Sequence, residues 1–211
     1  MAEFCQMYWP PIYAFLRHRG RSSGDAQDLT QAFFVHLLEH KTLTRADRQK
    51  GKLRTFLLGS LQNFLANEYD RAQALKRGGG KQILSLDDNF LEAEASIATT
   101  SSADPASSYD RTWASNLVKR AWQRLYDSFA ADGKQKWIDA MRPFIAGGSG
   151  TPASHDEIAA RLGVPVATFR TSLMRSRQRY REILREEVAQ TVSDPADVDE
   201  ELQYLYQILM S

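Results

Sequence analysis

The chain has a single cysteine, Cys5, among its 211 residues. One cysteine excludes an internal disulfide, and it fits a protein that works in the reducing cytoplasm. The sequence also lacks any apolar run near the ~20 residues that a membrane-spanning helix needs. Its N-terminus shows no basic segment leading into an apolar one, so no secretory signal is predicted. We therefore expect a cytoplasmic protein without membrane insertion.

Catalytic motifs are equally scarce. The sequence contains no glycine-rich phosphate loop and no nucleophile elbow. His36 and His40 stand four residues apart, a spacing that can hold a metal ion on a helix. The metalloprotease pattern needs Glu directly after the first His, however, and Leu37 stands there without an evident third ligand. We expect no enzyme activity, no metal site and no cofactor.

The net charge of +1 conceals a strongly uneven distribution. Residues 45–81 hold nine lysines and arginines against three acids, and residues 161–185 hold seven arginines against one acid. Residues 82–110 hold six acids without a base, and residues 193–211 hold five acids without a base. Two basic blocks around an acidic spacer indicate two surfaces that meet a polyanion, although solvated helix faces would give the same counts.

Hydrophobic spacing predicts an all-α chain, because no segment shows strand-like alternation. Helices are expected over residues 4–16, from Asp25 onward, and from residue 56 toward Arg77. Residues 81–108 are acidic and rich in Ser, Thr and Ala, which is typical of a flexible linker. Helical spacing returns near Tyr109. In the acidic tail, a further short helix is expected from the spacing of Tyr204, Leu205, Ile208 and Leu209.

The most informative segment covers residues 154–177. Ser154 followed by Glu157 predicts a capping box at the start of a helix that runs to Leu162. Gly163 suits the left-handed conformation that ends such a helix, and a short turn leads into a long second helix. This order is typical of a helix-turn-helix. The apolar residues expected to pack the two helices together are Ile158, Ala159, Leu162, Val164, Val166, Phe169 and Leu173.

Two segments together resemble the extracytoplasmic-function (ECF) group of sigma-70 family sigma factors. The first is the acidic D-x-x-D-L-x-Q-x-x-F helix of residues 25–34, followed by residues 52–57 and Asn63. The second is the helix-turn-helix of residues 154–177. The resemblance implies two small helical domains joined by the linker. These are region two at residues 1–80, the linker at 81–108, region four at 109–192 and an acidic tail at 193–211.

In this family, the acidic helix of region two binds the clamp helices of the largest polymerase subunit. The resemblance implies this role for Asp25, Asp28, Gln31 and Phe34. Compensation of the helix dipole would also explain the two aspartates, although it would not explain Gln31. The basic loop and the next helix of region two are implied to open and read the minus-ten element. The residues implied to contact DNA there are Arg48, Lys50, Lys52, Arg54, Asn63, Asn67, Arg71, Lys76 and Arg77.

The second helix of region four is implied to read the minus-thirty-five element in the major groove. The matching residues here are Thr168, Arg170, Thr171, Ser172, Arg175 and Arg177. Ser172 stands where the family commonly has Arg or Lys, which indicates a different target sequence or a weaker reliance on it.

These features predict a sigma factor that binds core RNA polymerase and directs promoter recognition and DNA melting for transcription initiation. An anti-sigma protein is a further implied partner. The alternative is a non-sigma helix-turn-helix regulator with an N-terminal helical interaction domain. The acidic stripe of residues 25–34 and the basic loop after it separate the two, because a regulator does not need them.

Overall fold

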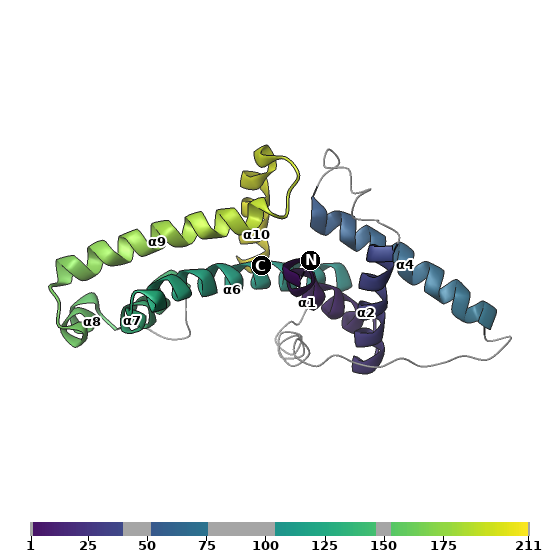
Figure 1. The fold of residues 1–211 in the computed structure, drawn as a ribbon, viewed down its shortest axis with the longest axis horizontal. Coiled ribbons are helices and arrows are strands. Elements are labelled where there is room, and N and C mark those ends of the chain that lie inside the picture. The colour runs from purple at the N-terminus through teal and green to yellow at the C-terminus, as the bar shows by residue number, and fades with distance from the viewer. Residues whose placement is uncertain (1, 40–51, 76–103, 147–152, 211) are drawn as a thin grey trace. The chain divides into compact units, whose positions relative to one another are not determined.

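The computed structural model describes residues 2–39, 52–75, 104–146 and 153–210 (Figure 1). All regular structure in these ranges is helical, which confirms the all-α prediction. The α-helices are α1 (Ala2–His18), α2 (Ser23–Glu39), α4 (Leu53–Leu75), α6 (Pro105–Ala131), α7 (Gln135–Ile145), α8 (His155–Leu162), α9 (Val166–Ala189) and α10 (Val198–Met210), and a short 3₁₀ helix, η1 (Pro195–Asp197), precedes α10. Within this part of the chain, every helix is too short or too polar to cross a bilayer.

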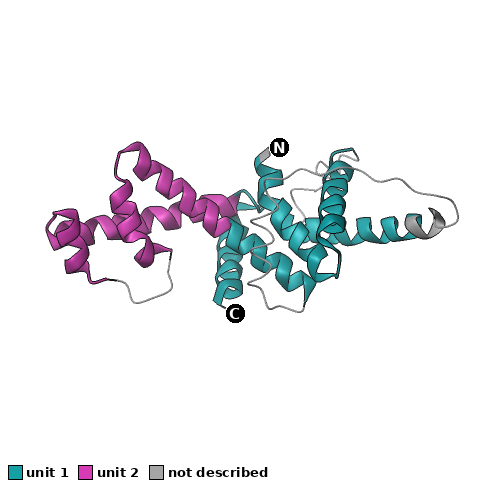
Figure 2. Ribbon diagram, turned by 90° about the horizontal axis from the view of Figure 1, so that it is seen from below, with its two compact units in different colours: residues 1–116, 190–211 teal, residues 117–189 magenta. Residues whose placement is uncertain are grey.

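The helices form two compact units (Figure 2). Unit 1 combines Met1–Asn116 with Gln190–Ser211, and unit 2 is Leu117–Ala189. The acidic tail therefore packs with the N-terminal part of the chain. These units follow packing, so the functional division into regions two and four remains a prediction.

Helix α6 begins at Pro105. This is four residues before Tyr109, where the apolar spacing predicted the helix to begin. Asp104 caps this end, because its carboxylate accepts hydrogen bonds from the backbone N–H groups of Ala106 (3.3 Å) and Ser107 (3.0 Å). Proline fits the first helical turn, because an N–H group there would have no hydrogen-bond partner within the helix. Residues 105–108, expected in the linker, are thus helical, since the first turn of a capped helix can be polar.

The core of unit 1 is built from aromatic and aliphatic side chains of α1, α2, α4 and α6. Its largest fully buried side chains include Trp113, Tyr8, Phe33, Leu57 and Leu61. Phe33 and Phe64 lie with ring centroids 5.5 Å apart, which joins α2 to α4. Burial of these apolar surfaces is the main force that holds the four helices together.

Helix α1 carries two consecutive prolines, Pro10 and Pro11, in its interior. Proline has no N–H, so these residues leave the carbonyls of Gln6 and Met7 without their helical donors. The side-chain amide of Asn116 donates to both of these carbonyls, at 3.2 Å and 2.8 Å. Asn116 thereby compensates for both hydrogen bonds that the prolines remove.

We expect Asn116→Ala to lower the free energy of unfolding by ~1–3 kcal/mol, because two carbonyls lose their donor. Asn116→Asp should cost more, since a carboxylate facing two carbonyl oxygens repels them. Thermal unfolding followed by circular dichroism measures both effects. Gln123→Ala, at an exposed position of the same helix, is the control and should change stability by less than ~0.5 kcal/mol. Equal stability of Asn116→Ala and wild type would contradict this account.

In unit 2, α8 and α9 confirm the predicted capping box and helix end. The Ser154 hydroxyl accepts from the Glu157 N–H, and the Glu157 carboxylate accepts from the Ser154 N–H. Gly163 takes the left-handed conformation with φ 68°. Ile158, Ala159, Phe169 and Leu173 share a buried cluster with Met141 of α7, and Leu162, Val164 and Val166 pack around it.

A buried carboxylate joins α6 to α9 inside unit 2. Glu187 is 1% exposed and accepts hydrogen bonds from Arg120 (2.9 Å) and Arg124 (2.8 Å). Two guanidinium partners compensate for the desolvation of this charge. The last turns of α9 are thus held by α6, whereas its first turns pack on α7 and α8 through Phe169 and Leu173.

Candidate nucleic-acid and polymerase interfaces

Helix α2 presents part of the predicted acidic stripe. Asp25 and Asp28 are exposed, and Gln31 is half-buried. Asp25 also has a local role, because its carboxylate accepts from the Ser22 hydroxyl (2.7 Å) at the helix start. Phe34 lies in the core instead, 6% exposed and stacked on Trp9 with ring centroids 5.8 Å apart. The polar members of the stripe therefore face solvent, whereas Phe34 holds α2 on α1.

Two apolar residues on α2 are exposed to solvent. Val35 is 46% exposed and Leu38 is 47% exposed. They continue the helical spacing of Asp28 and Gln31, so all four side chains share one face. The signal was present in the sequence as the i, i+3, i+7, i+10 spacing from Asp28. This face combines a carboxylate and an amide with two apolar side chains, a composition suited to a protein partner.

Helix α4 exposes the predicted base-reading residues. Asn63, Asn67 and Arg71 all face solvent along one side of the helix. Leu57 and Leu61 are buried on the opposite side. Arg71 lies 2.9 Å from Glu68 in an exposed ion pair, which solvent screens. Amide and guanidinium groups along one exposed face can donate and accept hydrogen bonds at base edges.

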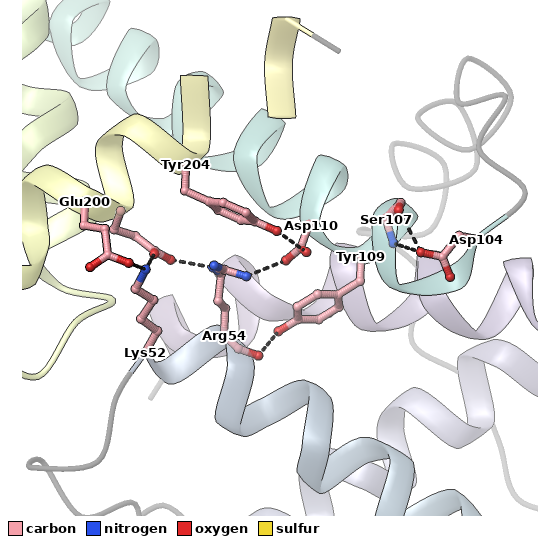
Figure 3. A network of polar contacts seen from close by, with 9 residues as sticks. Lys52, Arg54, Asp104, Ser107, Tyr109, Asp110, Glu200 and Tyr204 are labelled. Carbon is pink, nitrogen blue, oxygen red and sulfur yellow. Dashed lines mark hydrogen bonds and ion pairs between the residues drawn. The ribbon is translucent and has the colours of Figure 1, made fainter. Parts of the chain in front are cut away.

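The structure places Arg54 away from solvent. It is 8% exposed, and its guanidinium donates to Glu201 of α10 and to Asp110 of α6 at 2.5 Å and 2.8 Å (Figure 3). The same group lies 4.0 Å from the centre of the Tyr204 ring, a cation–π contact. Burial alone would lower the pKa of Arg54, but the bond to Glu201 and the charge of Asp110 outweigh it and raise that pKa. Arg54 therefore joins three helices and has no free donor face for a phosphate.

Lys52 is held by the same C-terminal helix. Its ammonium lies 2.8 Å from Glu200 and 2.9 Å from Glu201. Burial would lower the pKa of Lys52, yet the hydrogen bonds to both glutamates raise it above its usual value. The hydrogen bond from Lys52 in turn lowers the pKa of the exposed Glu200 carboxyl. Lys52 thus stays protonated and paired.

Tyr109 and Tyr204 complete this network. The Tyr109 hydroxyl, whose pKa burial raises well above its usual value, donates to the Arg54 backbone carbonyl at 3.1 Å. The Tyr204 hydroxyl donates to Asp110 at 2.7 Å. The sequence alone did not indicate Asp110, Glu201 and Tyr204 as partners of Arg54, because they lie far along the chain from it. The other residues implied to contact the minus-ten element, Arg48, Lys50, Lys76 and Arg77, lie outside the described residues.

The first turns of α9 expose most of the residues implied to contact the minus-thirty-five element. Thr168, Arg170, Thr171, Arg175 and Arg177 face solvent, and Ser172 is half-buried. An open cavity of about 670 Å³ runs along this side of the helix. Its lining contains His155, Arg170, Leu173, Met174, Arg175, Arg177, Gln178, Arg179, Arg181 and Glu182.

This arginine-rich cavity extends further than the sequence predicted. Arg179 and Arg181 add two cations to its lining. Arg179 is partly neutralised, because Glu182 and Glu186 lie 3.3 Å and 3.5 Å away. Arg177 is oriented by a hydrogen bond from its Nε to the Phe144 carbonyl, at 3.1 Å. The surface is therefore positive at the start of α9 and mixed in charge toward its middle.

The metal alternative gains no support from the geometry of His36. Its ring lies 5.3 Å from the Phe64 ring, centroid to centroid, in an aromatic contact between α2 and α4. Across the ranges that the structure describes, no three His, Cys, Asp or Glu side chains form a group that could hold a metal ion. His40 lies outside those ranges.

Residues 4–74 match the family model described as Sigma-70 region 2. The match covers all of α2 and nearly all of α1 and α4, and so includes the exposed Asp25 and Asp28 and the exposed face of Asn63, Asn67 and Arg71. It supports a sigma-70 family sigma factor, a non-enzymatic class of protein involved in transcription initiation. Comparison with curated proteins and comparison with solved structures give no match.

Proposed function

We propose that the protein is an ECF-group sigma factor that binds core RNA polymerase and directs promoter recognition and DNA melting. The observation that carries this proposal is the region two match at residues 4–74. Within it, α2 exposes carboxylates beside apolar side chains, and α4 exposes amides and a guanidinium on one face. The first surface suits a protein partner, and the second suits unpaired bases.

The second part of the proposal concerns unit 2. The capped helix α8, the turn at Gly163 and the arginine-bearing start of α9 suit a helix-turn-helix of region four, with α9 in the major groove. Exposed Arg170, Arg175 and Arg177 would contact phosphates and base edges of the minus-thirty-five element. Such a protein acts in the cytoplasm, and an anti-sigma protein is the partner expected to restrain it.

The test of this function is transcription by the chain and core polymerase together. On a library of promoter fragments, the mixture should give run-off transcripts and make thymines near the start site reactive to permanganate. Core polymerase without the chain is the control. If no bound promoter ever shows reactive thymines, the sigma assignment is wrong, and a helix-turn-helix regulator becomes the better explanation, because a regulator binds closed duplex.

Asp28→Arg should weaken binding to core polymerase by about tenfold, because it reverses a charge on the proposed interface. Titration of labelled chain with core polymerase, followed by fluorescence anisotropy, measures the affinity. Asp139→Arg, at an exposed position of α7, makes the same charge change in unit 2 and should leave the affinity unchanged. Unchanged affinity of Asp28→Arg, with unchanged circular dichroism, would place the polymerase interface elsewhere.

A further inference from the structure

The C-terminal segment reaches the first turn of α4. The backbone carbonyl of Thr191 accepts a hydrogen bond from the N–H of Leu53, the first residue of α4, at 3.1 Å. The first four N–H groups of a helix have no partner within the helix. Thr191 is 1% exposed and satisfies one of these four donors from outside the helix. Thr191, just before the acidic tail, thus caps α4 through its backbone carbonyl.

Charged side chains fasten the same junction. The carboxylate of Glu201 is fully buried and pairs with both Lys52 and Arg54, the residues on either side of Leu53. Glu200 adds an exposed contact to Lys52 at 2.8 Å. The ring of Tyr204 covers the guanidinium of Arg54. The tail therefore holds three consecutive residues at the start of α4.

The burial of the contact between α10 and the start of α4 indicates whether α10 stays bound to α4 or detaches from it. Removing α10 would expose Val198 and Leu205, which are 3% and 0% exposed, and would leave Arg54 without Glu201. Arg54 would then keep only Asp110 as a partner, and a buried charge that loses part of its compensation is strongly unfavourable. By contrast, the Lys52–Glu200 pair is open to solvent on one side, with the Glu200 side chain 71% exposed. Most of the contact is therefore buried like a protein core, and only the Lys52–Glu200 pair at its edge is open to exchange with solvent ions.

We propose that residues 190–210 form an internal brace that positions α4 for promoter opening. The brace fixes the start of the helix whose exposed face carries Asn63, Asn67 and Arg71. Lys52 and Arg54 are positioning residues of this brace. They bind the carboxylates of the tail and do not bind DNA phosphates. This inference rests on the proposed function, because it assigns the tail a part in strand opening.

The test uses the full chain with Cys5→Ser, Lys52→Cys and Glu200→Cys, joined by a flexible bis-maleimide. The matched control is the same chain with each thiol blocked by a mono-maleimide. Glu201→Gln is then added to both forms, since it removes the buried charge that holds Arg54. The readout is permanganate reactivity of promoter thymines at saturating core polymerase, which separates opening from polymerase affinity.

With Glu201→Gln, the blocked form should open the promoter about tenfold less than wild type, because the start of α4 is no longer held. The joined form should recover opening to about twofold of wild type, since the cross-link replaces the lost ion pairs. Circular dichroism of both forms at the assay temperature shows whether the helices persist. If the blocked form unfolds, recovery in the joined form still supports the brace.

Two results would overturn the proposal. If the joined form opens DNA less than the blocked form, the tail must detach from α4 during opening. The tail would then inhibit opening and would not support it. If the blocked form with Glu201→Gln opens DNA as wild type does, the tail has no part in the step. Both results require that wild-type chain opens the promoter in the same experiment. Failure of wild type itself would instead defeat the proposed function.

Discussion

Arg54→Met should lower the unfolding temperature of unit 1 by about 10 °C. Arg54 compensates for Glu201, which is 0% exposed, and for Asp110, whose side chain is 15% exposed. Removing one partner of a buried ion pair costs ~3–5 kcal/mol, because the remaining charge stays desolvated. In a chain of this size, each kcal/mol shifts Tm by ~2–4 °C. Lys52 still faces Glu201, so the lower end of the energy range applies here.

Arg71→Met is the control for this prediction. Arg71 lies on the same helix and forms an ion pair with Glu68, and the Arg71 side chain is 71% exposed. Solvent screens such a pair, so its loss should change stability by less than ~1 kcal/mol. Differential scanning calorimetry of both variants measures the difference. If Arg54→Met unfolds at the temperature of Arg71→Met, then Arg54 does not hold α10 and α6 together.

A triple substitution, Arg170→Gln, Arg175→Gln and Arg177→Gln, should weaken promoter binding by about a hundredfold or more. Each arginine that contacts a base edge contributes ~1–3 kcal/mol, and 1.4 kcal/mol corresponds to a factor of ten. The three guanidinium groups lie at exposed positions of α9 and line the cavity along it. If each also displaces a counterion, the slope of log affinity against log salt should fall by about three.

The control for the triple variant is a second one with the same loss of charge. Lys119→Gln, Lys134→Gln and Lys136→Gln change exposed lysines of unit 2 that lie outside α9. This chain should retain promoter affinity to about threefold and most of the salt dependence. Gel-shift titration with core polymerase over a range of salt concentrations measures both variants. A pre-melted promoter should not fully rescue the arginine variant, since its defect concerns closed duplex. Equal losses in both variants would mean that only net charge matters.

The helices and the cap of unit 2 could be predicted because their causes are local. Ser154 and Glu157 are three residues apart, and the cluster around Phe169 follows helical spacing. Hydrogen bonds between neighbouring residues and apolar periodicity act within a few turns, so a single sequence displays them. Asn63, Asn67 and Arg71 follow the same helical spacing, four residues apart, and they share one exposed face of α4.

The contacts that join distant segments could not be predicted in this way. Arg54 and Glu201 are 147 residues apart, and Asn116 lies 109 residues from Met7. Charge counts indicated a basic block at 45–81 and an acidic tail at 193–211, yet many pairings of these charges were possible. Only the packing of α10 beside α4 selects Glu201 for Arg54. Arg54 consequently appeared as one more exposed cation, although it is buried.

The amino-acid sequence alone was sufficient for the all-α fold class, the capping of α8, and the resemblance to the sigma-70 family, which the region two match supports. Each of these depends on neighbouring residues or on a motif that is read directly. Tertiary structure decided which cations remain available: Arg170, Arg175 and Arg177 stay exposed, whereas Lys52 and Arg54 are taken by the C-terminal helix. The physical reason is that a charge binds whichever opposite charge the packed helices place beside it, and sequence separation does not limit that choice.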